Sequence, residues 1–415
     1  EDNFMKGNVI VGQSGGPTAA INSSLAGVYR TARDRGAKKI YGMLNGIQGL
    51  MEEKYVDLSE HITCDLDVEL LKRTPAAYLG SCRFKLPDIH KDMATYEKIF
   101  TILNKLEIEA LIYIGGNDSM DTIKKLSDYA ILTGSEIRFI GCPKTIDNDL
   151  ALTDHTPGYG SAAKYIGTSV KEVIRDGYCL EYPKGLVTII EIMGRNAGWL
   201  TGASILARSE DCVGPDAIYL PEVTFDLKKF RDKIEKLLKQ KSSVVVCVSE
   251  GIHDKDGKYI CEYTDVANYV DAFGHKQLSG TAAFLANYIA GEFGCKTRSV
   301  EFATLQRAGS HLASRVDILE AYQVGGAAVL AADEGDTGKM VVLIRHSDDP
   351  YQCGTEVKDV HKIANDEKLV PKEWISKDGS YITDEFISYV RPLIQGDVQP
   401  IMVDGIPRHL YRPTK

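Results

Sequence analysis

Residues 109–116 read EALIYIGG, an apolar run of strand length that ends in two glycines. The next residues, SMDTIKKLSDYAILTG (119–134), place apolar side chains at helical spacing, and EIRFIGC (136–142) is a second apolar run. Apolar strands with a helix between them are typical of a parallel sheet that helices cover on both faces. This stretch therefore predicts an α/β fold.

The same alternation extends through most of the chain. Strands are predicted at NVIVG (8–12), KKIYGML (38–44), GLVTIIEIMG (185–194), AIYLPE (217–222), SSVVVCVSEG (242–251) and MVVLIRH (340–346). Helices are predicted at AAINSSLAGVYRTARDRG (19–36), YEKIFTILNKLEI (96–108) and FDLKKFRDKIEKLLKQK (225–241). Because 415 residues are too many for one compact core, we expect two three-layer α/β/α units with a cleft between them.

Composition excludes several classes of protein. The net charge is −9 and the basic residues are dispersed, which argues against a nucleic-acid or membrane-surface binder. The nine cysteines include no CxxC pair, so we expect reduced thiols and neither a zinc site nor a disulfide framework. Residues 1–12 lack a signal-peptide layout, and no apolar run reaches membrane-helix length. We therefore expect a cytoplasmic protein.

Two glycine-rich turns follow predicted strands and open predicted helices. GQSGGPTAAIN (12–22), which contains Gly15 and Gly16, matches neither a Walker A loop nor GxGxxG, and it could be a tight turn or an anion site. IGGNDSMDT (114–122) contains Asn117, Asp118 and Ser119, which could cap a helix or, beside two glycines, supply oxygen ligands to Mg²⁺. Strand ends of this kind are where open α/β sheets bind ligands.

A third polar stretch, PKTIDND (143–149), follows the strand at 137–142. Asp147 and Asp149 would share one face if the segment is extended and could converge if it is a turn. One carboxylate could bind a metal ion while the other accepts a proton. Lys144 beside them favours a transferring phosphoryl group over an ordinary solvated turn.

Basic residues also lie near predicted strand ends. Arg83 follows a glycine turn in GSCRF (80–84), and Arg195 follows a strand in MGRNAGWL (193–200). Arg298 and Arg307 stand at either end of a strand-like run, TRSVEFATLQRAGS (297–310). Each alone could form a surface salt bridge, but together they favour a sugar-phosphate pocket, with Glu250 accepting hydrogen bonds from sugar hydroxyls.

These motifs together resemble the phosphofructokinase family. GGNDS (115–119), PKTIDND (143–149), MGRNAGW (193–199) and LQRAGS (305–310) occur in the family's order and at compatible spacing, and the resemblance covers roughly residues 8–350. It implies two similar Rossmann-like domains with the active site in the cleft. We expect a larger, donor-side domain at 1–157 plus about 306–356 and a smaller, sugar-side domain at 158–305. No role is predicted for residues 357–415.

The resemblance implies a role for each matching residue. Asp147 is the base for the sugar 1-hydroxyl, which Thr145 helps to place, and Arg195 stabilises the transferring phosphoryl group.

The other sites follow in the same way. Met193, Gly194 and Glu250 contact the sugar, and Arg307 and Arg298 bind its 6-phosphate, with Arg298 supplied by a neighbouring subunit of a dimer or tetramer. The family resemblance places Gly15, Gly16, Arg83, Asp118 and Ser119 in the donor site, and Asn117 and Asp149 at a Mg²⁺ site.

Two positions bear on the phosphoryl donor. ATP-using members resemble GGDGS and GTIDND, whereas pyrophosphate-using members resemble GGDDS and PKTIDND. This chain has Asp118 and Lys144, the second pattern at both positions. The resemblance therefore implies reversible phosphorylation of fructose 6-phosphate by pyrophosphate, a step of glycolysis and gluconeogenesis. ATP as donor, or sedoheptulose 7-phosphate as acceptor, are the alternatives.

The chain also departs from the family's pattern. Asn117 replaces the usual metal-binding aspartate, and Leu186 replaces an arginine that reaches across a subunit interface, with Lys184 nearby as a possible substitute. Leu25 and Tyr29 stand where allosteric relatives have effector-site arginines. We therefore expect weaker Mg²⁺ binding at residue 117 and little regulation by nucleotides.

Overall fold

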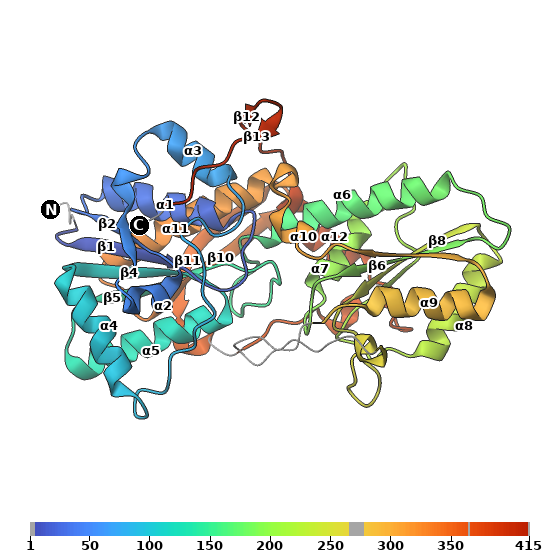
Figure 1. Cartoon of the computed structure of the whole chain (residues 1–415), viewed down its shortest axis with the longest axis horizontal. Helices are drawn as coiled ribbons and strands as arrows, with labels where there is room; N and C mark the ends of the chain where they lie inside the picture. The colour runs from blue at the N-terminus through green and yellow to red at the C-terminus, as the bar shows by residue number, and fades with distance from the viewer. Residues whose placement is uncertain (1–4, 265–277, 364–365, 414–415) are drawn as a thin grey trace.

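The computed structural model describes residues 5–264, 278–363 and 366–413, so the first four residues of the amino-terminal stretch lie outside it. Two separate sheets lie side by side, the larger at the left of Figure 1 and the smaller at the right, each with helices packed on it. The α/β class with two units is therefore confirmed. Within the described ranges, no helix has the length and apolar character needed to cross a membrane.

The larger sheet has seven strands. Its five inner strands are parallel, while the two edge strands, β3 and β11, each pair antiparallel with a neighbour. In spatial order the strands are β11 (Tyr351–Asp359), β10 (Lys339–Asp348), β5 (Arg138–Pro143), β4 (Ile108–Gly115), β1 (Asn8–Gln13), β2 (Ile40–Met43) and β3 (Tyr55–Asp57). The parallel arrangement places the ends of β1, β4 and β5 at one edge, where the polar motifs begin.

Alternate residues of these strands enter two cores on opposite faces. Val9 and Val11 pack in one core with α1 and α11, whereas Ile10 packs in the other with α4 and α5. Such double burial explains why the strands read as continuous apolar runs. The helices of this unit are α1 (Ile21–Asp34), α2 (Gly46–Met51), α3 (Asp65–Arg73), α4 (Met93–Lys105), α5 (Asn117–Thr133) and α11 (Arg315–Asp333).

Helices α1 and α11 approach each other closely because glycines face across their contact. A Cβ on Gly27 would lie 2.0 Å from the carbonyl oxygen of Tyr322, and one on Gly325 would lie 2.0 Å from that of Ser24. Side chains at these positions would force the helices apart. The contact joins an early and a late part of the chain within one layer.

The smaller sheet is entirely parallel. Its order is β7 (Ala217–Tyr219), β8 (Ser243–Ser249), β6 (Leu186–Ile192) and β9 (Lys296–Glu301). One face packs on α8 and α9, and the other packs on α6 and on carboxyl-terminal residues. The remaining α-helices are α6 (Tyr159–Tyr178), α7 (Trp199–Gly202), α8 (Leu227–Leu238), α9 (Thr281–Phe293), α10 (Leu305–Ala308) and α12 (Asp384–Val390).

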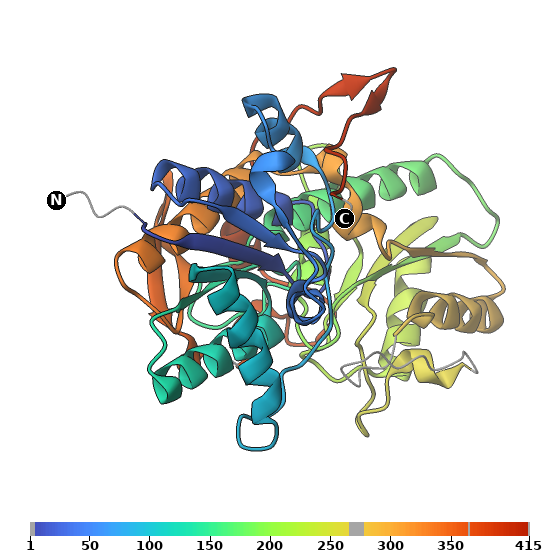
Figure 2. The same cartoon turned by 60° about the vertical axis from the view of Figure 1, so that its left-hand side comes forward.

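Residues after 356 belong to both units. Strand β11 continues in the larger sheet to Asp359, whereas Val370, Phe386 and Leu393 are buried in the core of the smaller unit. A short hairpin, β12 (Met402–Val403) and β13 (Ile406–Pro407), projects from the body of the molecule (Figure 2). The predicted domain boundaries stay a prediction, although three residues of the expected extension lie in β11.

Short 3-10 helices complete the described secondary structure. They are η1 (Leu58–Glu60), η2 (Ala203–Ala207), η3 (Ile260–Tyr263), η4 (Ser310–Leu312), η5 (Val360–Lys362), η6 (Lys372–Trp374) and η7 (Arg391–Ile394).

A buried ionic network ties the loop after β5 to the larger unit. His155 is 3% exposed, and its ring nitrogens lie 2.7 Å from Asp154 Oδ2 and 2.5 Å from Glu320 Oε2. Arg345 Nη2 donates to Asp154, and the Tyr351 hydroxyl donates to Glu320. Burial alone would lower the pKa of His155, but the two carboxylates outweigh it and raise that pKa to about 9. His155 is therefore a buried cation at neutral pH.

This network predicts a stability that decreases with rising pH. The folded pKa of His155, about 9, exceeds the ordinary histidine value, so its stabilisation is complete below about pH 6.5 and is lost as the pH rises through 9. We expect a loss of roughly 3 kcal/mol in the free energy of unfolding across this range. Urea unfolding at several pH values measures it.

His155→Gln should remove this particular pH dependence, whereas the matched change His409→Gln, at an exposed position, should retain it. Parallel stability profiles for the unaltered chain and His155→Gln would contradict the assignment of the buried charge.

Candidate active site

A cleft of about 480 Å³ opens where β1, β4 and β5 end, facing the smaller unit. Five of the stretches that the sequence singled out line it, together with Glu367 from the carboxyl-terminal region. The lining residues are Ser14, Gly15, Gly16, Arg83, Gly116, Asn117, Asp118, Ser119, Lys144, Thr145, Asp147, Asp149, Arg195, Asn196 and Glu367. The structure thus brings the predicted donor, base and metal residues into one cleft.

The loop after β1 is fixed by hydrogen bonds to residues 81 and 82. Gly15 has a φ of 77°, a left-handed conformation that favours glycine, and its carbonyl accepts a hydrogen bond from Ser81 Oγ. The Gly15 N–H donates to the carbonyl of Cys82. The exposed Arg83 follows directly and lines the same side of the cleft.

The loop after β4 passes directly into α5. Of the two alternatives for Asn117, Asp118 and Ser119, helix capping does not apply: Gly116 is the N-cap, and these three residues form the first helical turn. A Cβ on Gly115 would lie 1.8 Å from Ser119 Oγ, so glycine is required for this approach. The first turn of the 17-residue helix α5 therefore lines the cleft. The amino terminus of a helix carries partial positive charge, which favours a bound anion.

Lys144 connects the three loops. It is 2% exposed, its N–H donates to the carbonyl of Gly115 at 2.9 Å, and its Nζ donates to the carbonyl of Gly16 at 2.6 Å. Burial lowers the pKa of Lys144 to about 8, against the raising effect of the Asp147 charge. A partly desolvated ammonium beside a cleft attracts anions more strongly than one in water.

The chain turns between Asp147 and Asp149. Of the two conformations that their spacing allowed, extended or turned, the structure has the turn. Asn148, between them, has a φ of 55°, and its side-chain oxygen accepts from the Thr156 N–H. The Asp147 N–H donates to Thr145 Oγ1. Burial raises the pKa of both carboxyls; that of Asp149 reaches about 7, with the charge of Asp147 contributing. Two carboxylates in one confined space favour a bound cation or a proton between them.

The smaller unit contributes the opposite wall of the cleft. Arg195 and Asn196, in the loop after β6, line it, whereas Met193, Gly194 and Glu250 do not. Glu250 Oε1 instead accepts from the Gly194 N–H at 3.2 Å, and burial raises the pKa of Glu250 to about 7. Met193 and Gly194 directly precede Arg195, and Glu250 is bonded to Gly194, so these three residues lie beside the cleft wall.

The two remaining arginines are placed differently. Arg307 lies on α10, so the expectation that it ends a strand is wrong; the backbone leaves β9 at Glu301 and turns into a helix. Its Nη1 would lie 3.3 Å from a Cβ on Gly16, and its buried Nε has no hydrogen-bond partner among the described residues. Arg298, on the edge strand β9, pairs with Asp176 and does not line the cleft of its own chain.

The departures from the family pattern can also be placed. Leu186 is fully buried as the first residue of β6. Lys184 packs against Gly294, since a Cβ added to that glycine would lie 3.0 Å from Lys184 Nζ. Leu25 and Tyr29 are buried in the larger core. Whether Lys184 takes over the arginine's role stays a prediction.

Four cleft residues were not among the predicted site residues, and two of them, Ser14 and Gly116, lie within the glycine-rich turns that the sequence singled out. Asn196 directly follows Arg195 within a motif that was singled out, so its position was a signal that could have identified it. Glu367 gave no such signal, because it lies in the region without a predicted role. It reaches the cleft by pairing with Leu150 in an isolated antiparallel bridge.

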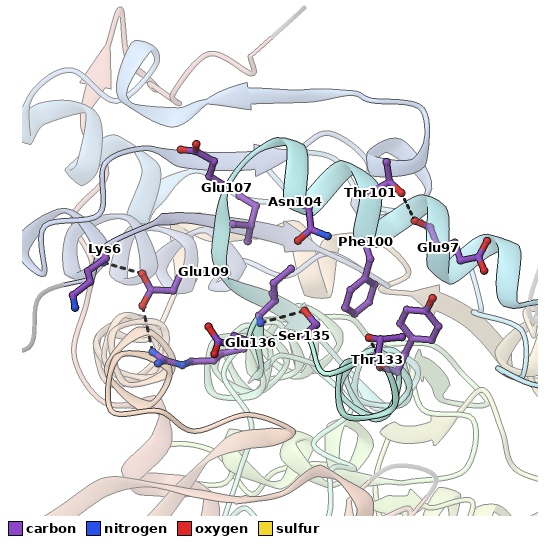
Figure 3. Close-up of a pocket in the computed structure, with 14 residues that line it drawn as sticks. Lys6, Glu97, Phe100, Thr101, Asn104, Glu107, Glu109, Thr133, Ser135 and Glu136 are labelled. Atoms are coloured by element: carbon purple, nitrogen blue, oxygen red, sulfur yellow. Dashed lines mark hydrogen bonds and ion pairs between the residues drawn. The ribbon is translucent and has the colours of Figure 1, made fainter.

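A second hollow, of about 860 Å³, lies at the opposite end of the larger sheet and contains none of the predicted residues (Figure 3). Four glutamates and two cations line it, and Glu109 accepts from the Lys6 N–H and pairs with Arg138. An excess of carboxylates repels phosphates. This hollow therefore does not compete with the cleft as a phosphate site.

Comparison with known proteins gives a consistent result. The family model described as Phosphofructokinase matches residues 8–332. The pyrophosphate--fructose 6-phosphate 1-phosphotransferase of Xanthomonas campestris pv. campestris is 40% identical, with 97% of this chain and 96% of that protein covered. The protein of the same description from Halomonas elongata is 38% identical, over 97% and 95%.

Among solved structures, the pyrophosphate-dependent phosphofructokinase of Nitrosospira multiformis superposes with a TM-score of 0.87 at 36% identity and covers 98% of both chains. The fold, the motif-bearing cleft and these relatives agree, and the chain belongs to the phosphofructokinase family.

Proposed function

We propose that this protein transfers a phosphoryl group from pyrophosphate to the 1-hydroxyl of fructose 6-phosphate, giving fructose 1,6-bisphosphate and phosphate. The observation that carries the proposal is that Asp118 and Lys144 both line the cleft that also contains Asp147. Relatives that cover nearly the whole chain have this activity in their names. The phosphoanhydride bond that breaks in pyrophosphate and the phosphate ester bond that forms at the sugar 1-position have comparable free energies of hydrolysis. The reaction would therefore run in both directions.

The donor preference follows from charge and space. Asp118 lies in the first turn of α5, where a glycine would leave room for a nucleotide's α-phosphate. A carboxylate there crowds and repels that group. Lys144 adds a desolvated cation for pyrophosphate or for the phosphate that leaves. Together the two side chains limit the donor site to a diphosphate.

The chemical step needs a base and a stabilised phosphoryl group. The oxygen of the 1-hydroxyl attacks the terminal phosphorus, the bridging P–O bond breaks, phosphate leaves, and the hydroxyl proton passes to the Asp147 carboxylate. Thr145 Oγ1, which accepts from the Asp147 N–H, helps to fix this turn. Arg195, on the opposite wall, would balance the charge that develops on the phosphoryl oxygens.

The sugar would lie between the two units. Met193 and Gly194 lie beside the cleft, and the Gly194 N–H donates to Glu250 Oε1. The other carboxylate oxygen of Glu250 would accept hydrogen bonds from sugar hydroxyls. Arg307, whose Nε is buried without a partner in the described chain, would bind the 6-phosphate. An unpaired buried donor of this kind is costly until an anion binds it.

Mg²⁺ fits the oxygen-rich corner of the cleft. Asn117 Oδ1 is buried without a hydrogen-bond partner in the described ranges, and Asp149 lines the same cleft. Amide and carboxylate oxygens are ligands that Mg²⁺ accepts, usually with the substrate's phosphates and water completing the shell. When bound, the ion would neutralise pyrophosphate charge. Asn117 and Asp149 are therefore the residues that would hold it.

We further propose a cytoplasmic homo-oligomer, a dimer or tetramer, with a shared site. Arg298 lies outside the cleft of its own chain, as a residue that serves a neighbouring subunit would. The nine cysteines are all free thiols, which agrees with a reducing compartment.

Replacing the base tests the chemical step. We expect Asp147→Asn, which keeps the shape of the side chain, to lower kcat about 10²- to 10⁴-fold with the fructose 6-phosphate dissociation constant nearly unchanged. Steady-state kinetics and calorimetric titration measure the two quantities. Turnover close to that of the unaltered chain would remove Asp147 from the role of base.

Replacing both donor-site residues tests the donor. The unaltered chain should use pyrophosphate far better than ATP, in one coupled assay with Mg²⁺. Asp118→Gly combined with Lys144→Gly should lower kcat/KM for pyrophosphate by at least tenfold while fructose 6-phosphate binding changes little.

Three results would contradict parts of this proposal. Equal rates with ATP would refute the donor assignment, and unchanged pyrophosphate kinetics in the double variant would refute its structural basis. Higher kcat/KM with sedoheptulose 7-phosphate than with fructose 6-phosphate would correct the acceptor.

The metal site can be tested at one position. We expect Asn117→Asp to lower the Mg²⁺ concentration that gives half-maximal rate, because a carboxylate binds the ion more strongly than an amide. Asn104→Asp, at a distant helix position, is the matched control. Equal Mg²⁺ requirements in all three proteins would place the ion elsewhere.

A further inference from the structure

The carboxyl-terminal segment 366–370 lies between the two walls of the cleft and is bonded to both. On the larger unit, the Lys368 N–H donates to the carbonyl of Asp149 at 2.7 Å, and Lys368 Nζ donates to the carbonyls of Thr153 and Asp154 at 3.0 and 2.7 Å. On the smaller unit, Trp199 Nε1 donates to the carbonyl of Lys368 at 2.8 Å. The backbone of this segment is therefore fixed relative to both loops.

A further carboxylate strengthens the attachment to the smaller unit. Glu222 Oε1 accepts from the Val370 N–H at 3.0 Å and from the Gly198 N–H at 2.7 Å. One oxygen atom thus joins the segment to the loop that carries Arg195. The position of that loop depends on the segment as well as on β6.

Glu367 projects from this fixed backbone into the cleft. It lines the cleft with Asp147 and Asp149, and both of its carboxylate oxygens accept from Asn196 Nδ2, at 3.0 and 3.3 Å. Asn196 follows Arg195 directly and is otherwise exposed. The bond therefore holds the tip of the loop that carries the phosphoryl-binding arginine.

We propose that Glu367 is a positioning residue of the active site: through Asn196 it holds Arg195 over the cleft, opposite Asp147. This inference rests on the proposed function, in which Arg195 stabilises the transferring phosphoryl group. Glu367 does not have to touch the substrate. The hydrogen bond between Glu367 and Asn196 would keep Arg195 aligned. Because Arg195 acts mainly on the charge that develops in the transition state, losing this alignment should affect kcat more than substrate binding.

This role predicts a particular kinetic pattern. Glu367→Ala should lower kcat about 10- to 100-fold, the range expected for losing one charge-assisted hydrogen bond. The KM for fructose 6-phosphate should change less than about threefold, because the sugar-binding residues are untouched. Glu367→Gln should restore most of kcat, since its amide oxygen still accepts from Asn196.

Two further variants isolate the bond. Asn196→Ala should reproduce the loss seen in Glu367→Ala, and the double variant should be no slower than either single one, because both changes remove the same contact. Asp366→Ala is the matched control: it removes an exposed carboxylate one residue away that does not line the cleft. It should leave kcat unchanged.

The outcomes separate the possibilities. A kcat for Glu367→Ala within twofold of the unaltered chain would overturn the proposal. Equal losses in Glu367→Ala and Glu367→Gln would show that charge, and not the hydrogen bond, is what the site needs, which also overturns it. If Glu367→Ala does not fold, as circular dichroism would show, Asn196→Ala decides the question.

Failure of the proposed function would look different. It would appear as undetectable pyrophosphate-dependent turnover in the unaltered chain, before any variant is compared. If that chain uses ATP instead, the same variants can be assayed with ATP, since the predicted effect acts on Arg195 and not on the donor site.

Discussion

The ammonium group of Lys144 lies among the loops that follow three parallel strands, and the site depends on its burial. One residue bonds to both of the other loops, through its N–H to Gly115 and its Nζ to Gly16. A desolvated cation is costly unless carboxylates or carbonyls offset the loss of water, and Asp147 and the Gly16 carbonyl do so in part. An anion that enters the cleft completes the balance, so the protein arranges its donor site before any phosphate binds.

The sequence was most informative where the signal is local. The inner strands β1, β4 and β5 are buried on both faces and read as apolar runs, and the polar motifs at 14–16, 116–119 and 144–149 directly follow their ends. Parallel pairing then brings those motifs together without further information. The fold class and the clustering of Asn117, Lys144 and Asp147 could therefore be predicted from residue order and periodicity.

The parts that could not be predicted depend on contacts between distant residues. Glu367 reaches the cleft because it pairs with Leu150, and His155 is charged because Glu320 lies beside it in the fold. Neither pairing leaves a periodic trace in the chain. The left-handed backbone of Asn148 was also undetermined, since Asn and Asp occur in turns and in extended segments alike.

The aromatic residues after position 356 have a packing explanation. Trp199 stacks on Phe386 with ring centroids 5.9 Å apart, and Trp374 lies 5.6 Å from Tyr389. Together with α12 they cover the face of the smaller sheet that α6 leaves open. Tyr389 also accepts from Asn148 Nδ2, so this cluster is connected to the turn that carries Asp147.

The close contact between α1 and α11 has a consequence for the order in which the protein can fold during synthesis. The strands of the smaller sheet, from β6 to β9, are contiguous in the chain, whereas the larger sheet lacks one inner strand and one covering helix until residues 315–348 have been made. Its apolar face stays exposed throughout the translation of the smaller unit. Late long-range closure of this kind is slow and favours aggregation. The smaller unit shares this delay, because Val370, Phe386 and Leu393 complete its core only near the end of synthesis.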